Sequence, residues 1–131
     1  RQAQVERTPI AKLCVQHEAL SKHFHPELAI SIDGRPMPIP ANIGVEPACM
    51  HGIHTHDESG RLHVETPDDR AVYLKDFFAV WGQPFSSSQL LDKTVDDRHE
   101  LLMTVNGVRT EALEELVLEE EQQISLEYRA K

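Results

Sequence analysis

The sequence has few basic residues, no long apolar run and no familiar catalytic motif. It contains 13 lysine and arginine residues against 22 acidic residues, which gives a formal net charge of −9 with histidine counted as neutral. Nucleic acids and anionic membrane surfaces attract clustered lysine and arginine, and no such cluster is visible here. We therefore expect neither of them as a partner.

Apolar stretches are short, and none approaches the roughly 20 residues that cross a bilayer. The first residues also lack the charged and apolar segments of a signal peptide. The chain opens at Arg1 rather than at methionine, so we expect that a signal or anchor segment has been removed from its N-terminus. The expected location is periplasmic or extracellular, with membrane anchoring through that removed segment as a further expectation.

Only two cysteines are present, Cys14 and Cys49. An even number suits an exported protein, because disulfides persist in oxidising compartments. One interpretation is a disulfide or a pair of buried thiols. The other is metal ligation by thiolates, since Cys14 precedes His17 and Cys49 precedes His51.

The length of 131 residues predicts one domain, because the chain can bury one core but not two. Residues 1–24 carry apolar side chains at mostly helical spacing after Thr8 and Pro9, which predicts a short amphipathic helix that ends near His23. Residues 25–131 are expected to form a β-rich body.

Alternating apolar residues and turn dipeptides predict the strands of this body. Three prolines place one segment at a sheet edge, because proline cannot donate to a strand ladder. The predicted strands and turns are residues 28–32, the turn Asp33-Gly34, the edge segment 35–40, the hairpin 101–110 around Asn106-Gly107, and a last strand over 124–128.

A helix is predicted over residues 73–81, where apolar side chains recur at positions i, i+3, i+4 and i+7 before Gly82. Residues 86–98 are polar and are predicted to be a loop, and the acidic run over 111–121 is expected to be a solvated face. The predicted core consists of Leu28, Ile30, Ile32, Phe77, Phe78, Trp81, Val105, Ile124 and Leu126.

These elements predict an α+β fold with a mainly antiparallel sheet and one helix packed across it, in a β-grasp-like arrangement, plus the short N-terminal helix. A β-sandwich with helical decoration is the alternative.

The segment over residues 52–66 concentrates histidine and carboxylate side chains. Side chains two positions apart on a strand share a face. With Ser59-Gly60 as a two-residue turn, His56 lies opposite His63 and His54 opposite Glu65, all on one face. The other face then carries Ile53, Leu62 and Val64. A slip of one residue would mix the two sets, so the burial pattern favours the register that gathers the polar groups.

Clustered neutral imidazoles are typical of metal sites, with copper or zinc as the expected ion. His54, His56 and His63 are the central candidate ligands, and Glu65 is expected to bind the ion or to orient a ligand. Cys49 and Met50 would favour copper if they reached the site. Further candidate ligands are His23, His25 and His51, whereas His17 and His99 are expected to take no part.

The function that we expect is metal binding in the cell envelope. One alternative is a metalloenzyme in which Glu65, Asp57 or Glu58 acts as general base beside three histidine ligands. The sequence has no His-Glu-x-x-His, nucleophile elbow or glycine-rich phosphate loop, which disfavours that alternative. Another alternative is an interaction module with a pH-sensitive histidine face and no metal.

Several short motifs occur in order between His23 and Trp81: His-x-His-Pro-x-Leu, Ile-Pro-Ala-Asn-Ile-Gly, His-Thr-His-Asp-x-Ser-Gly-x-x-His-Val-Glu and Phe-Phe-x-x-Trp-Gly. This series resembles an uncharacterised family of exported or membrane-anchored bacterial and archaeal domains. The resemblance covers about half of the chain. It implies export and a special role for His54, His56, His63 and Glu65, without naming a reaction.

Overall fold

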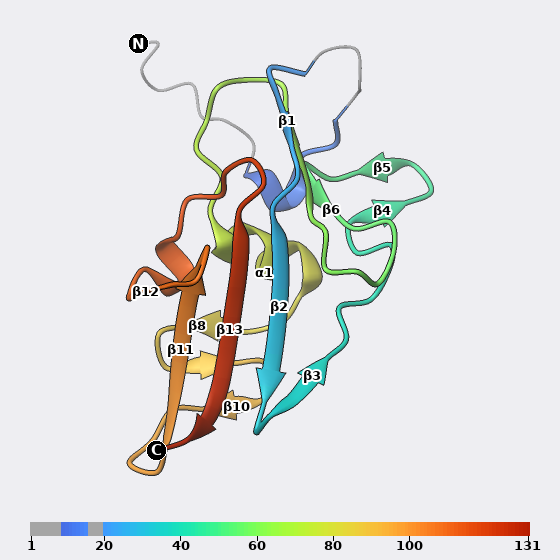
Figure 1. Cartoon of the computed structure of the whole chain (residues 1–131). Helices are drawn as coiled ribbons and strands as arrows, with labels where there is room; N and C mark the ends of the chain where they lie inside the picture. Colours follow the sequence, from blue (N-terminus) through green and yellow to red (C-terminus); the bar gives the residue numbers. More distant parts are fainter. Residues whose placement is uncertain (1–8, 16–19) are drawn as a thin grey trace, which may run out of the picture.

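A computed structural model describes residues 9–15 and 20–131. Within this part of the chain one α-helix accompanies several β-sheets, which confirms an α+β fold. The largest sheet has five strands in the order β12-β11-β13-β2-β3 (Figure 1). Its strands are β2 (Glu27–Ile32), β3 (Arg35–Met37), β11 (His99–Val105), β12 (Val108–Thr110) and β13 (Gln123–Ala130).

Local sequence explains most of this sheet. Leu28, Ile30 and Ile32 are buried on one face of β2, as their alternation predicts. Asp33 and Gly34 both have positive φ, the conformation of a tight hairpin turn, and they connect β2 to β3 at the sheet edge. The predicted hairpin around residues 106 and 107 joins β11 to β12.

The pairing of β13 was not expected from an antiparallel fold. It runs antiparallel to β11 but parallel to β2, with Leu126 opposite Ile30. The sheet is therefore mixed, although most of its pairings are antiparallel.

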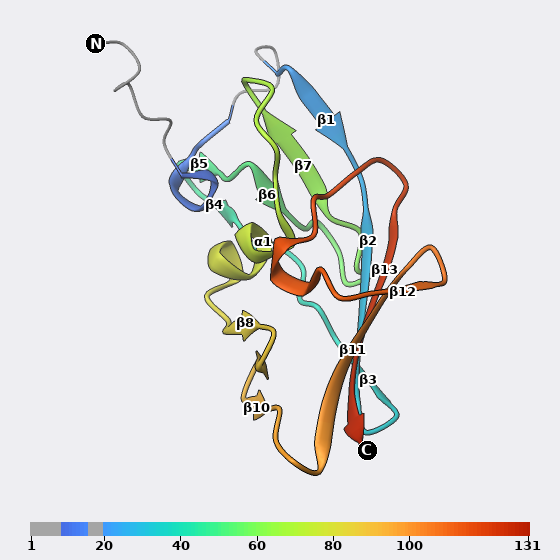
Figure 2. The ribbon, with the colours of Figure 1, turned by 90° about the vertical axis from the view of Figure 1, so that its left-hand side faces the viewer.

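The helix α1 (Leu74–Trp81) lies on one side of the five-stranded sheet (Figure 2). At its start the backbone N–H of Tyr73 donates to the Asp76 carboxylate at 2.8 Å. At its end Gly82 takes a left-handed conformation, with φ of 79°. Phe77 and Phe78 are buried, so the predicted aromatic stripe is confirmed as a core contact, while Trp81 is half-buried.

The prediction of a loop over residues 86–98 is wrong. A small antiparallel meander lies there, made of β8 (Phe85–Ser86), β9 (Gln89–Leu90) and β10 (Lys93–Thr94). Leu90 has no exposed surface, and the Tyr128 hydroxyl donates to the Thr94 carbonyl at 2.7 Å. The burial of Leu90 and the hydrogen bond from Tyr128 both depend on segments that are distant in the sequence. A local pattern of polar residues does not reveal such contacts.

The predicted N-terminal helix is also wrong for the described residues. Ile10–Lys12 form one turn of 3-10 helix, η2, and the chain then extends so that the Val15 N–H donates to the Met50 carbonyl at 2.8 Å. Lys22–Phe24 form strand β1 where the helix was expected to end. Residues 1–8 and 16–19 of the predicted helix lie outside the described residues.

Cys14 and Cys49 form a disulfide with a Cα–Cα distance of 5.1 Å. This pairing confirms the first interpretation of the cysteines and excludes thiolate ligation in this state. It ties the N-terminal segment to the short ribbon of β4 (Val45–Glu46) and β5 (Cys49–Met50). Around Cys14 the backbone is extended and forms an isolated antiparallel bridge with His51.

A second sheet of three strands, in the order β1-β7-β6, lies beyond one end of β2 (Figures 1 and 2). It contains β6 (Ile53–His54) and β7 (His63–Thr66), with β1 at its edge. The predicted core residues are buried in the structure, except that Trp81 and Val105 are half-buried. Within the described part, no helix has the length and apolar character needed to cross a bilayer.

We expect Phe78→Ala to lower the free energy of unfolding by about 3–5 kcal/mol, because the ring is almost fully buried and its loss leaves a cavity. Denaturant titration followed by circular dichroism measures this change. Val108→Ala is the control, since Val108 is 69% exposed and should change stability by less than about 0.5 kcal/mol. A loss below about 1 kcal/mol for Phe78→Ala would contradict the packing of α1.

Replacing both cysteines by serine should cost about 3–4 kcal/mol, because the bridge closes a long loop and restricts the unfolded chain. The two residues are 35 positions apart. The same titration on the parent protein, with and without reductant, provides an independent measurement. Equal midpoints with and without reductant would show that the bridge does not stabilise the fold.

Candidate metal centre

The two faces of the small sheet differ sharply in chemistry. His54 on β6 pairs with His63 on β7, and Glu65 lies two residues further on, so their side chains share a face. Ile53 and Val64 form the neighbouring pair and have no exposed surface on the other face. The predicted separation of polar and apolar side chains is therefore confirmed.

The predicted register is wrong by two residues. His63 pairs with His54 rather than with His56, and residues 55–62 form a connection instead of a two-residue turn. A shift of two residues leaves every side chain on its predicted face, because the side-chain period of a strand is two. The error therefore changes the neighbours but not the set of residues that face one another.

Contacts with the start of β2 explain the longer connection. The Leu28 N–H donates to the Gly60 carbonyl, and the Leu62 N–H donates to the Pro26 carbonyl, both at 2.8 Å. Gly60 has a φ of 86°, and a Cβ there would collide with the Leu28 carbonyl oxygen. The connection is thus held against β2, which fixes the direction in which His63 leaves it.

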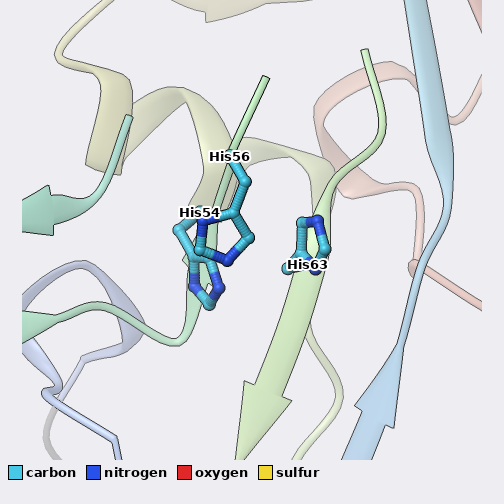
Figure 3. A group of neighbouring side chains, drawn as sticks. All are labelled: His54, His56 and His63. Carbon is cyan, nitrogen blue, oxygen red and sulfur yellow. The ribbon is translucent and has the colours of Figure 1, made fainter. Parts of the chain in front are cut away.

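Three imidazoles converge on this face (Figure 3). One nitrogen each from His54, His56 and His63 can be chosen so that all three lie within 4.8 Å of one another. The rings of His54 and His63 are stacked with centroids 5.3 Å apart, and the His56 ring lies 4.5 Å from that of His63. His54 is buried, His63 half-buried and His56 exposed, so the group opens to solvent on one side.

The buried ring of His54 is oriented by a backbone group. Its Nδ1 lies 2.8 Å from the carbonyl oxygen of His51, and because a carbonyl only accepts, Nδ1 must donate. In the neutral ring the lone pair is therefore on Nε2, which faces Glu65 Oε2 at 3.4 Å. Ligating histidines are held in this way in metal proteins, with one nitrogen donated and the other presented to the ion.

Glu65 is buried at the centre of the face, with 1% of its surface exposed. Strand β1 brings His23 directly opposite it, with His23 Nε2 at 3.5 Å from Glu65 Oε2. The carboxylate therefore lies between His54 and His23. A buried carboxylate needs nearby donors or cations to offset the loss of hydration.

His25 follows β1 and extends the cluster. Its ring lies 4.8 Å from that of His63 and 4.9 Å from that of His23. Partial burial lowers the pKa of His25, and the charge of Arg61 lowers it further. The predicted candidates His23 and His25 thus both lie beside the three-histidine group, His23 next to Glu65 and His25 next to His63.

The structure places His51 apart from these rings. Its Nε2 lies 3.2 Å from Glu46 Oε2 and 3.8 Å from the Sγ of Cys49, so its side chain faces the disulfide. It contributes its carbonyl to His54 instead. This backbone role carries no signal in the sequence. Met50 pairs with Val45 in the β4–β5 ribbon, and Cys49 is oxidised, so the three-histidine group contains no sulfur ligand.

Asp57 organises the connection between the strands. Its Oδ1 accepts from both the hydroxyl and the backbone N–H of Ser59, at 2.6 and 3.0 Å. These two hydrogen bonds lower the pKa of Asp57. Because the carboxylate is ionised and bound within the turn, a structural role fits it better than that of a general base.

His63 is held in its neutral form. Partial burial lowers its pKa to about 4, and the neighbouring rings of His56 and His54 add to the effect. Protons compete with metal ions for imidazole nitrogens, so His63 remains available as a ligand in more acidic solution than an ordinary histidine.

Comparisons with protein-family models, with curated proteins and with solved structures found no match for this chain. The chemistry of the site is therefore inferred from the residues that form it and from their geometry. Three imidazole nitrogens suit a borderline transition-metal ion and leave a coordination position open. Calcium and magnesium, which prefer oxygen ligands, fit this group poorly.

We expect the metal-free protein to lose stability as the pH falls from about 6.5 toward about 4. The unfolded chain protonates His63 near about pH 6.5, whereas the folded protein does so only near its pKa of about 4. Between these values the unfolded state binds more protons, so acidification favours unfolding.

Denaturant titrations of the metal-free protein at about pH 7 and about pH 5 measure this effect, and His63→Gln should show a smaller loss between the two. Equal losses in the parent and the variant would contradict the low pKa of His63.

Proposed function

We propose that this protein binds Zn(II) or Cu(II) through His54, His56 and His63. One observation carries the proposal: three imidazole nitrogens lie within 4.8 Å of one another, two of them from the paired strands β6 and β7 and the third from the connection between these strands. Most histidines in proteins keep some exposed surface, whereas His54 has none.

The surroundings of the group support a bound cation. Neutral imidazoles do not offset the charge of a divalent ion, but Glu65 lies 3.4 Å from His54 and contributes a negative charge in a buried position. The His51 carbonyl fixes the orientation of His54 before any ion arrives. Such pre-orientation reduces the conformational entropy lost on binding.

Donor chemistry narrows the choice of ion. Cu(I) prefers thiolate and thioether ligands, and the three-histidine group contains neither. Zn(II) and Cu(II) accept imidazole nitrogen with carboxylate oxygen nearby. The disulfide also suits an oxidising compartment, where Cu(II) persists.

We further propose an extracytoplasmic location and membership of the exported family that the motifs resemble. The disulfide supports the location, since such bonds are rare in reducing compartments. A β-grasp-like arrangement is proposed for the fold. Its support is the pairing of β2 with β13 in parallel at the sheet centre, together with the position of α1 between the hairpins β2–β3 and β11–β12 in the sequence.

A metalloenzyme is the second candidate. It is favoured by the exposure of His56, which leaves the open side of the group accessible to a small molecule, and by the buried Glu65 carboxylate beside His54. Three nitrogen ligands with one open position are typical of hydrolytic zinc sites. An ion that exchanges freely favours a carrier, whereas a tightly held ion with a bound water favours an enzyme.

We expect protein purified without a histidine tag or chelating resin to bind Zn(II) or Cu(II), and His56→Ala and His63→Ala each to weaken that binding by at least roughly tenfold. Isothermal titration calorimetry with the metal chlorides gives the affinities, and elemental analysis gives the metal content. Affinity should also fall as the solution is acidified, because protons compete for the ligands.

His99→Ala is the matched control, since His99 lies on β11 of the five-stranded sheet, where its ring stacks on Tyr128 and its Nδ1 lies 2.9 Å from Asp96 Oδ1. Parent-like affinity in both site variants would refute the proposal. No binding of either ion under any loading condition would leave the pH-sensitive histidine face as the better interpretation.

A further inference from the structure

The two ends of the disulfide differ in their access to solvent. Cys14 is exposed, whereas Cys49 is half-buried in the β4–β5 ribbon. The side chain of His51 lies beside Cys49, with its Nε2 at 3.8 Å from the Cys49 Sγ. A disulfide opens when a thiolate attacks one of its sulfurs and the other sulfur leaves. Access from solvent therefore favours attack at Cys14, with Cys49 as the leaving sulfur.

A hydrogen-bond donor is already in place for that leaving sulfur. His51 Nε2 also lies 3.2 Å from Glu46 Oε2, and because a carboxylate only accepts, Nε2 must carry the proton. The same N–H thus faces the sulfur that becomes a thiolate when the bridge opens. Donors and positive groups beside a cysteine stabilise its thiolate, and a more stable thiolate leaves faster. The imidazole of His51 therefore favours opening in this direction.

The bridge is also joined to the metal centre through the backbone that precedes β6. Cys14 forms an antiparallel bridge with His51, and the Val15 N–H donates to the Met50 carbonyl at 2.8 Å. The carbonyl of His51 in turn accepts from His54 Nδ1 at 2.8 Å. Opening the disulfide removes the covalent part of this attachment, so the carbonyl that orients His54 is held less firmly.

The start of the same segment packs on the neighbouring residue. Ile10 is buried, and its Cδ1 fills the space that a Cβ on Gly52 would need. The Gly52 carbonyl accepts from the Glu65 N–H at 2.8 Å, which places this backbone against β7. The segment that the disulfide holds thus lies against the backbone that supports both strands of the metal centre.

We propose that the disulfide is a thiol-exchange site whose opening lowers the metal affinity of the three-histidine group; the effect on affinity rests on the proposed function. An external thiolate, from a small thiol or a protein dithiol, attacks the Cys14 Sγ. The bond between Cys14 and Cys49 breaks, a new S–S bond joins Cys14 to the external sulfur, and Cys49 leaves as a thiolate that accepts from His51 Nε2–H.

A second external thiolate completes the reaction. It attacks the external sulfur of the mixed disulfide, so that Cys14 leaves as a thiolate and an external disulfide is released. The two electrons that reduce the bridge come from the two external thiols, whose protons pass to the solvent. Without the covalent tie, His54 is less well oriented before an ion arrives, and pre-orientation of a ligand contributes to affinity.

The site of attack is tested with the oxidised parent protein and glutathione. Free thiols are trapped with iodoacetamide at early times, and peptide mapping by mass spectrometry locates the glutathione. We expect glutathione on Cys14 and a trapped thiol on Cys49, and glutathione on Cys49 overturns the proposal. Reduced thioredoxin is compared at equal thiol concentration: faster opening by thioredoxin identifies a protein dithiol as the source of the thiolate, and faster opening by glutathione identifies a small thiol.

His51→Ala tests the imidazole, because the variant keeps the backbone carbonyl that orients His54. We expect its bridge to open at least about threefold more slowly with glutathione. His51→Gln retains a side-chain N–H donor and restores part of the rate. His99→Ala is the control and opens at the parent rate, since His99 lies on β11 of the five-stranded sheet. A parent-like rate in His51→Ala overturns the proposal.

The link to the metal centre is measured on the parent protein in buffers of reduced and oxidised glutathione, with Zn(II) in excess or absent. If opening lowers the affinity for an ion, a bound ion must oppose opening by the same factor, because coupling is reciprocal. We expect half-opening in Zn(II) to need a value of [glutathione]²/[glutathione disulfide] at least about tenfold higher than without Zn(II).

Equal values with and without Zn(II) overturn the proposal, while calorimetry that still detects Zn(II) binding leaves the proposed function intact. A parent that binds no Zn(II) refutes the proposed function and with it the effect on affinity, whereas the peptide mapping still decides the site of attack. Circular dichroism is recorded at each buffer ratio. Loss of the fold on opening would show that the ion is lost by unfolding rather than through His51, and would also overturn the proposal.

Discussion

The site depends on strand β7, which has one apolar face in the core and one polar face. It pairs with β1 on one side and β6 on the other, so its two faces fix the chemistry of all three strands. Val64 faces the core, and this burial forces His63 and Glu65 to the opposite face. Burial of the apolar face therefore stabilises the arrangement that assembles the polar cluster on the other face.

A second layer of support comes from the disulfide and from backbone groups. The disulfide fixes the ribbon before β6, His51 in that region gives its carbonyl to His54, and Gly60 allows the connection to approach β2. These contacts orient side chains without contributing ligands. Because none of these groups is itself a ligand, substitutions of the ligands alone do not reveal how the ligands are positioned.

Local signals in the sequence predicted the elements whose burial follows a simple period, namely β2, α1 and the hairpin of β11 and β12. They failed where distant contacts decide the structure. Residues 1–24 were interpreted as helical, but in the described part Cys14 is tied to Cys49 by the disulfide and His23 pairs with Glu65 in strand β1. The faces of β6 and β7 were predicted correctly, because side chains alternate with a period of two and a register error of two residues leaves them on the same face. The register itself depends on contacts with β2, which the sequence does not reveal.

The parallel pairing of β2 with β13 has a consequence for the order of events during synthesis. Glu27 in β2 lies opposite Gln123 in β13, so nearly a hundred residues separate partners that must meet before the sheet closes. Folds with such distant pairings have high contact order and close slowly. The β1-β7-β6 sheet is joined to the start of β2 through the chain after β1 and through the hydrogen bonds of Gly60 and Leu62, so its position against the five-stranded sheet becomes final only after β13 has been made. A growing chain that ends before residue 123 therefore lacks the partner that holds β2 at the centre of the sheet.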